Sequence, residues 1–177
     1  MRKLNLILFL FFLSISLFGC QTDDKKAHTA NHNLSKEMPN DFNFSVQFGV
    51  EKKNEINTFD GTVTKDLIQD GTITIDLIFT KEEMKAIYEK MVEVNIGETK
   101  DFIPKSINGI VCMQEPHADD EWKIVINGKT ITHSFSGEYC EPTKDAKQLI
   151  DLRNEVFAII KGKSPYQSLP NTKGGYH

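Results

Sequence analysis

The dipeptide Asn127-Gly128 lies between two runs of strand-forming residues, 121–126 and 129–135. Asn-Gly accommodates the positive φ angles of a two-residue turn, so this pattern predicts a β-hairpin. A two-residue loop sets the following pairs: Ile126 with Lys129, Ile124 with Ile131, and Trp122 with His133. One face of the hairpin is therefore largely apolar and has to be covered by another part of the chain.

Residues 42–50 alternate between apolar and polar side chains. This period of two predicts a strand with one buried face, and we expect the globular domain to begin here. The dipeptides Asp60-Gly61 and Asp70-Gly71 are turn signals. They separate further strand-like runs at 56–59, 62–68 and 72–79, and a shorter run lies at 110–113. These runs predict an antiparallel meander that precedes the hairpin.

Two segments have the apolar periodicity of amphipathic helices. The first follows Thr80, and Glu83 three residues later completes a capping box. The second follows Thr143, which is a suitable N-cap, and ends at Gly162. The order strands, helix, strands, helix predicts an α+β domain in which an antiparallel sheet has two helices packed on one face.

The N-terminus has the features of a secretory signal. Arg2 and Lys3 are the only charged residues before position 23, and residues 4–18 are almost entirely apolar. This run is shorter than the roughly 20 residues that a helix needs to cross a bilayer. We therefore expect export and cleavage rather than a permanent transmembrane helix.

The tetrapeptide at the end of this run, Leu17-Phe18-Gly19-Cys20, resembles the lipobox of bacterial lipoproteins. The resemblance implies that Cys20 receives a diacylglyceryl group and becomes the new N-terminus after cleavage. Acyl chains contribute roughly 0.8 kcal/mol per buried methylene, so such a residue anchors a protein stably to a membrane. The alternative is an ordinary signal peptide followed by an unmodified cysteine.

We therefore divide the chain into a signal peptide at 1–19, a lipidated cysteine with a polar, flexible tether at 20–41, and one globular domain at 42–177. The layout, together with the stretches at 58–62 and 120–124, resembles small uncharacterised surface lipoproteins of spore-forming bacteria. That resemblance supplies no functional residue.

Removing residues 1–19 leaves 19 basic and 25 acidic residues, a formal charge of −6. Nucleic-acid binding needs clustered Lys and Arg, so we expect no nucleic-acid partner.

Once Cys20 is assigned to lipid, Cys112 and Cys140 remain as an even pair in an oxidising compartment, which predicts a disulfide. Two free thiols or a metal site are the alternatives.

Few residues are candidates for chemistry. His117, Asp119 and Asp120 lie in an acidic stretch that we interpret as a turn and that offers weak ligands for a metal such as Ca²⁺; a solvated charged turn is the alternative. His133 is either a packed histidine or a catalytic group. The chain has no nucleotide, zinc-protease or nucleophile-elbow motif, so we assign no catalytic residue and no cofactor.

These observations favour a non-enzymatic, membrane-anchored binding or interaction module of the cell envelope, with an envelope protein as the expected partner. The hypothesis predicts exposed apolar or aromatic side chains, with Tyr139, Tyr166 and Phe102 as the candidates.

Two alternatives stay open. The first is an envelope hydrolase, which requires His133 to converge with Asp76 or Glu138 in a pocket. The second is a metal or small-solute binding lipoprotein built on His117 and the acidic stretch that follows it.

Overall fold

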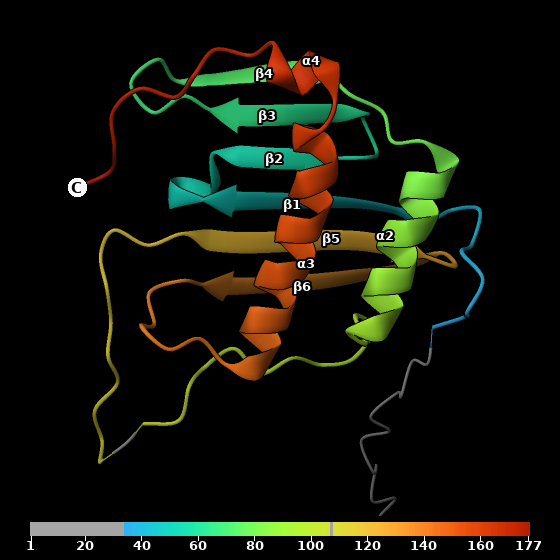
Figure 1. Ribbon diagram of the computed structural model, residues 1–177. Coiled ribbons are helices and arrows are strands. Elements are labelled where there is room, and N and C mark those ends of the chain that lie inside the picture. Colours follow the sequence, from blue (N-terminus) through green and yellow to red (C-terminus); the bar gives the residue numbers. More distant parts are fainter. Residues whose placement is uncertain (1–33, 107) are drawn as a thin grey trace, which may run out of the picture. The chain divides into compact units, whose positions relative to one another are not determined.

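A computed structural model describes residues 34–106 and 108–177 (Figure 1). This part of the chain contains a six-stranded sheet in the order β4-β3-β2-β1-β5-β6, in which every neighbouring pair is antiparallel. The strands are β1 (Asn43–Gly49), β2 (Asn54–Asn57), β3 (Thr62–Asp66), β4 (Thr72–Asp76), β5 (Asp119–Ile126) and β6 (Lys129–Ser136). The α+β class with an antiparallel sheet is confirmed. The signal-like segment, the lipobox and Cys20 lie outside the described residues.

This part of the chain contains three α-helices: α2 (Lys81–Glu93) lies between β4 and β5, and α3 (Lys144–Lys161) and the short α4 (Ser164–Gln167) follow β6. The predicted capping box of α2 is present, because the Thr80 side chain accepts from the Glu83 N–H and the Glu83 carboxylate accepts from the Thr80 N–H. Thr143 caps α3 as predicted. None of the helices in the described ranges is long and apolar enough to cross a membrane.

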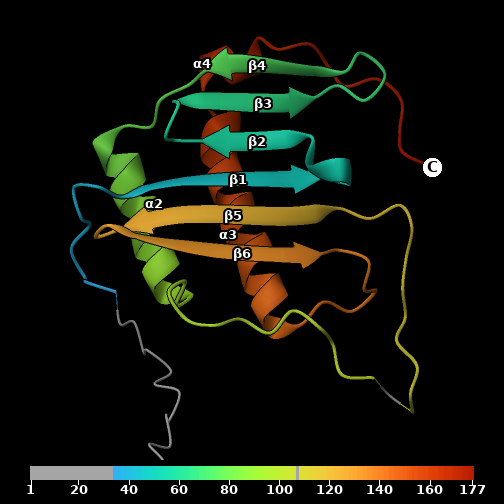
Figure 2. The same ribbon diagram turned by 180° about the vertical axis from the view of Figure 1, so that it is seen from behind.

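The sheet is buried on one face only. Figure 1 shows α2 and α3 in front of the sheet, and Figure 2, seen from behind, shows the opposite face without a covering helix. In the central strands β1 and β5 every second residue is buried, as one-sided packing requires. The innermost strand side chains are Phe44, Val46, Ile56, Val63, Trp122 and Ile124.

The β5–β6 hairpin has the predicted register, including Trp122 opposite His133. Asn127 and Gly128 have φ angles of 52° and 72°, the left-handed values that this turn requires. The Asp41 carboxylate accepts hydrogen bonds from both turn N–H groups, and these bonds lower the pKa of Asp41.

The domain extends further toward the N-terminus than the predicted boundary at residue 42. Leu34 and Met38 pack against the core, and the Tyr88 hydroxyl donates to the Ser35 carbonyl at 2.7 Å. Residues 34–41, expected as part of the tether, therefore belong to the domain.

The strand predicted at 110–113 is wrong. Met113 pairs at a single position, with Tyr139, and Ile110 and Met113 are 74% and 61% exposed. A strand needs a continuous partner, whereas this segment meets the chain beyond β6 at single positions. The tail after residue 162 contains the short helix α4.

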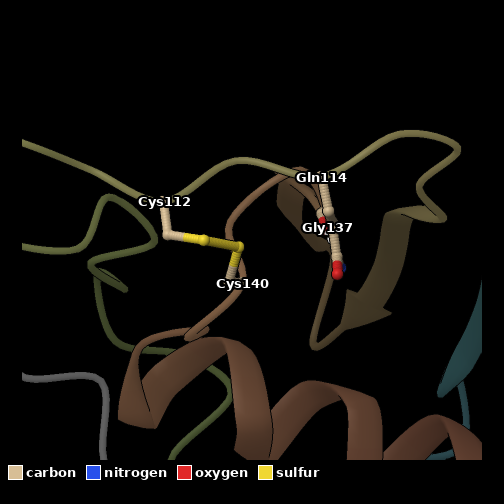
Figure 3. The surroundings of a disulfide bond; sticks show 4 residues. All are labelled: Cys112, Gln114, Gly137 and Cys140. Atoms are coloured by element: carbon tan, nitrogen blue, oxygen red, sulfur yellow. Dashed lines mark hydrogen bonds between the residues drawn. A yellow bond between two sulfur atoms is a disulfide. The ribbon is translucent and has the colours of Figure 1, made fainter.

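The predicted disulfide between Cys112 and Cys140 is confirmed. It joins the long loop before β5 to the segment that connects β6 with α3, as Figure 3 shows. The Cys140 N–H also donates to the Cys112 carbonyl at 3.1 Å, so covalent and hydrogen bonds link the same two segments.

Replacing both cysteines, Cys112→Ser with Cys140→Ser, should lower the free energy of unfolding by about 3 to 4 kcal/mol, because the loop of 28 residues is no longer closed in the unfolded chain. Urea denaturation measures this difference. Reductant should destabilise the wild-type protein by a similar amount and leave the double variant unchanged; an equal stability of the two proteins would contradict the prediction.

Candidate functional site

A groove of about 600 Å³ runs along β6, which is one of the two edge strands of the sheet. Residues 129–134 of β6 form one side of the groove and residues 97–100 with Phe102 form the other. Leu34, Ser35, Ile126 and Asn127 also line the groove. The volume lies within the range of pockets that hold small ligands, roughly 300 to 1,000 Å³.

The backbone of β6 presents free hydrogen-bonding groups to this groove. A two-residue hairpin begins with a hydrogen-bonded pair, and such pairs alternate with non-bonded ones along the ladder. Ile131 and His133 therefore bond inward to β5, while Thr130, Thr132 and Ser134 direct their N–H and C=O groups outward. Within the described ranges no backbone group bonds to these outward positions.

His133 holds the outer wall of the groove in place. Its side chain is buried on the covered face of the sheet, and Nε2 lies 2.7 Å from the Ile96 carbonyl oxygen, to which it donates. Burial lowers the pKa of His133 below its ordinary value of 6.5, and the positive charge of Lys100 acts in the same direction. The neutral imidazole is therefore a structural hydrogen-bond donor.

The wall is also fixed to the N-terminus of α3. The Thr143 hydroxyl donates to the Asp101 carbonyl at 2.7 Å, and the Asp101 N–H donates to the Asp145 carboxylate at 2.8 Å. The buried Lys100 ammonium donates to the Val94 carbonyl at 2.7 Å. Four separate contacts, with His133 included, thus hold the wall beside β6.

The two sides of the groove differ in chemistry. Phe102 packs against Phe135 and His133, with ring centroids 5.1 and 6.0 Å apart, and Ile131 faces the same side of the sheet. Thr130 and Thr132 lie on the opposite side. A segment placed along β6 therefore meets apolar surface on one side and hydroxyl groups on the other.

The candidate metal residues are not brought together. His117 Nε2 lies 3.4 Å from Asp119 Oδ1, but Asp120 follows on the strand and faces the covered side, where its Oδ1 accepts from Arg153 at 2.7 Å. The acidic stretch is not a turn, because β5 begins at Asp119. In the ranges that the structure describes, no three His, Cys, Asp or Glu side chains are placed to hold a metal ion.

The residues of the hydrolase hypothesis are also separated. His133 lies on β6 and Asp76 on β4, which are the opposite edges of the sheet. Five strand spacings of about 4.8 Å separate these edges by about 24 Å. Glu138 lies beyond the end of β6 and does not line the groove.

Exposed apolar side chains occur at other positions than the sequence predicts. Tyr139, Tyr166 and Phe102 are each partly buried. The large exposed apolar residues near the groove and disulfide are instead Ile103, Ile110, Val111 and Met113, all in the loop before β5.

Comparison with known proteins gives no relative for this chain: it matches no protein-family model and no curated protein. The function is therefore inferred from the geometry of the domain and from the residues of the sequence. The groove was missed by sequence reasoning because its wall and β6 are joined by contacts between distant residues, such as His133 with Ile96. The available signal was the length of β6 beyond a reliable turn, which marks a well-defined strand edge.

Replacing His133 by Gln should remove a pH-dependent loss of stability while keeping a donor toward Ile96. Since folding lowers the pKa of His133, the unfolded chain takes up a proton below about pH 6.5 that the folded chain does not. Wild-type stability should thus fall relative to His133→Gln as the pH decreases from 6.5, by at most about 1.4 kcal/mol per pH unit. Urea titrations of both proteins between about pH 7.5 and 5 measure this; parallel curves would contradict it.

Proposed function

We propose that this protein is an extracytoplasmic lipoprotein, anchored through a lipid on Cys20, whose domain binds an extended peptide segment of an envelope protein along β6. The observation that carries the proposal is the outward backbone edge of Thr130, Thr132 and Ser134, which lines a groove with a fixed opposite wall. A peptide that adds as a strand satisfies such an edge with its own main chain.

The chemistry of the groove favours one kind of segment. Along an added strand the side chains alternate between the two faces of the sheet. One set contacts Phe102 and Ile131, and the other contacts the hydroxyl groups of Thr130 and Thr132. The preferred partner is therefore an extended segment with alternating apolar and polar side chains.

The wall at residues 97–102 argues for a single strand rather than a second copy of this chain. Two copies paired through β6 would bring each sheet against the wall of the other, and the wall is fixed by His133, Thr143 and Asp145. A single peptide strand needs only about 4.8 Å beside β6 and carries no such wall.

The anchoring part of the proposal is supported by the sequence. The apolar run at 4–18 ends in the lipobox-like residues Leu17 to Cys20, and a lipid at this cysteine supplies a membrane contact. The mature charge of −6 supports a protein partner in preference to nucleic acid.

Proline at Thr132 should weaken peptide binding without breaking the β5–β6 ladder, because the N–H that it removes points into the groove. The probe is an acetylated, amidated heptapeptide of alternating Val and Thr, and calorimetry on the detergent-purified chain measures its affinity. We expect Thr132→Pro to weaken binding by at least about tenfold. Hydrogen exchange of the wild type should show peptide-dependent protection at Thr130, Thr132 and Ser134.

Thr74→Pro is the matched control. Thr74 is paired with Thr64 on β3 and has its N–H at the far edge of the sheet, outside the groove lining. This variant should bind the peptide as the wild type does. An equal loss in both variants, or full binding of a peptide with alternate N-methylated amides, would contradict binding at β6.

Cys20→Ser tests the anchor independently. If Cys20 carries the lipid, the variant should lose incorporation of labelled palmitate and move from the membrane fraction to the soluble fraction or medium. Mass spectrometry of the N-terminal peptide identifies the modification. Cys112→Ser is a suitable control, since it removes a thiol without touching the lipobox; labelling that persists in Cys20→Ser would reject the assignment.

A further inference from the structure

A second cavity, of about 200 Å³, lies beside the disulfide and is separate from the groove. The largely buried side chains of Asp120 and Arg153 line it, and Phe135, Ile150 and Tyr139 contribute apolar surface. Gln114 and Cys140 also line it and are exposed, so the cavity opens on the side of the disulfide.

Asp120 is an unusual residue for the covered face of the sheet. It is 1% exposed, and its Oδ1 accepts from Arg153 Nη1 at 2.7 Å. Its Oδ2 is buried and has no hydrogen-bond partner among the described residues. Buried carboxylate oxygens nearly always have donors, so this oxygen indicates a place for a donor from outside the chain.

Arg153 cannot turn to supply that donor without losing other contacts. Its guanidinium carbon lies 5.1 Å from the centroid of the Phe48 ring, and Nη2 donates to Asn154 Oδ1 at 3.4 Å. The guanidinium is therefore held to one carboxylate oxygen by stacking and by a second hydrogen bond.

Burial raises the pKa of Asp120 to about 6, although Arg153 acts to lower it; the neighbouring charge of Asp119 raises it further. At neutral pH the Asp120 carboxylate is thus mainly ionised, and among the described residues Arg153 is the one cation that acts on it against the charges of Asp120 and Asp119. A second cation at Oδ2 would balance these charges.

We propose that the cavity binds a small organic cation with a primary ammonium group, which donates to Asp120 Oδ2 while its apolar body contacts Phe135 and Ile150. An ammonium has three donors and no acceptor, which matches a carboxylate oxygen without a partner. The volume of about 200 Å³ limits the ligand to a compact molecule, below the size of most drug-like ligands.

The disulfide holds the opening of this cavity in shape. Gln114 donates from its backbone N–H to the Glu138 carbonyl at 2.7 Å and from its side chain to the Gly137 carbonyl at 3.0 Å. Figure 3 shows the Gln114 side chain directed toward Gly137, with the Cys112–Cys140 bond joining the same two segments. The hydrogen bonds and the disulfide therefore fix the two segments on either side of the opening relative to each other.

The test uses the full chain in detergent at about pH 7.5, with calorimetry of benzylamine, benzyl alcohol and benzoate. These probes share an aromatic body and differ in charge. We expect benzylamine to bind with a Kd in the millimolar range or tighter, and the alcohol and the acid at least about tenfold more weakly. Equal binding of amine and alcohol, or no amine binding up to about 10 mM, would overturn the proposal.

Asp120→Asn should weaken benzylamine binding by at least about tenfold, whereas Asp76→Asn, an exposed carboxylate on β4, should leave it unchanged. If Asp120→Asn does not fold, Ile150→Phe provides a second test, because it fills the cavity from α3 and keeps the pair of Asp120 and Arg153. Wild-type amine binding in the folded Asp120→Asn or in Ile150→Phe would place the amine elsewhere and reject the site.

Discussion

The two-residue turn at Asn127-Gly128 sets the register of β5 and β6, and both proposed binding places depend on that register. A shift of one residue would exchange the two faces of a strand. His133 would then leave the covered face. The backbone N–H and C=O of Thr132 would bond to β5 and would no longer point into the groove. Asp41 strengthens this constraint, since its carboxylate accepts from both N–H groups of the turn.

Two buried polar side chains on the covered face of the sheet have partners from distant parts of the chain. His133 bonds to the Ile96 carbonyl, and Asp120 bonds to Arg153 on α3. A buried ion pair is seldom more stabilising than apolar residues of the same size, because both charges lose their hydration. Stability alone therefore gives no reason for a half-satisfied carboxylate at Asp120, whereas a ligand that supplies the missing donor does.

Local signals in the sequence predict the parts of the fold that depend on near neighbours. The hairpin register, the capping box at Thr80 and Glu83, the start of α3 after Thr143 and the disulfide were all predictable, because spacing and residue type determine them. The order of the six strands in the sheet was not predictable, because it depends on the pairing of β5 with β1, which lies about 70 residues earlier in the chain.

The sites were less predictable than the fold for the same reason. Asp120 was singled out by its acidic neighbours, but strand alternation places it on the opposite face from Asp119 and next to Arg153, 33 residues away. The wall of the groove is held by the contact of His133 with Ile96 and by the contacts of Asp101 with Thr143 and Asp145. These residues are far apart in the sequence, so no local pattern indicates the contacts. The run at 110–113 has the composition of a strand, but its pairing with the chain beyond β6 is limited to the single position Met113 with Tyr139.

The proposed anchor limits where a peptide partner can be. Leu34 lines the groove and is 14 residues from Cys20, a distance of at most about 50 Å when the chain is fully extended. A lipid on Cys20 would keep the groove within that distance of the membrane. Confinement of both partners to such a layer raises their effective concentration, so a weak strand-to-strand contact suffices for binding. The proposed anchor would therefore favour a membrane-proximal segment of another envelope protein as the peptide partner.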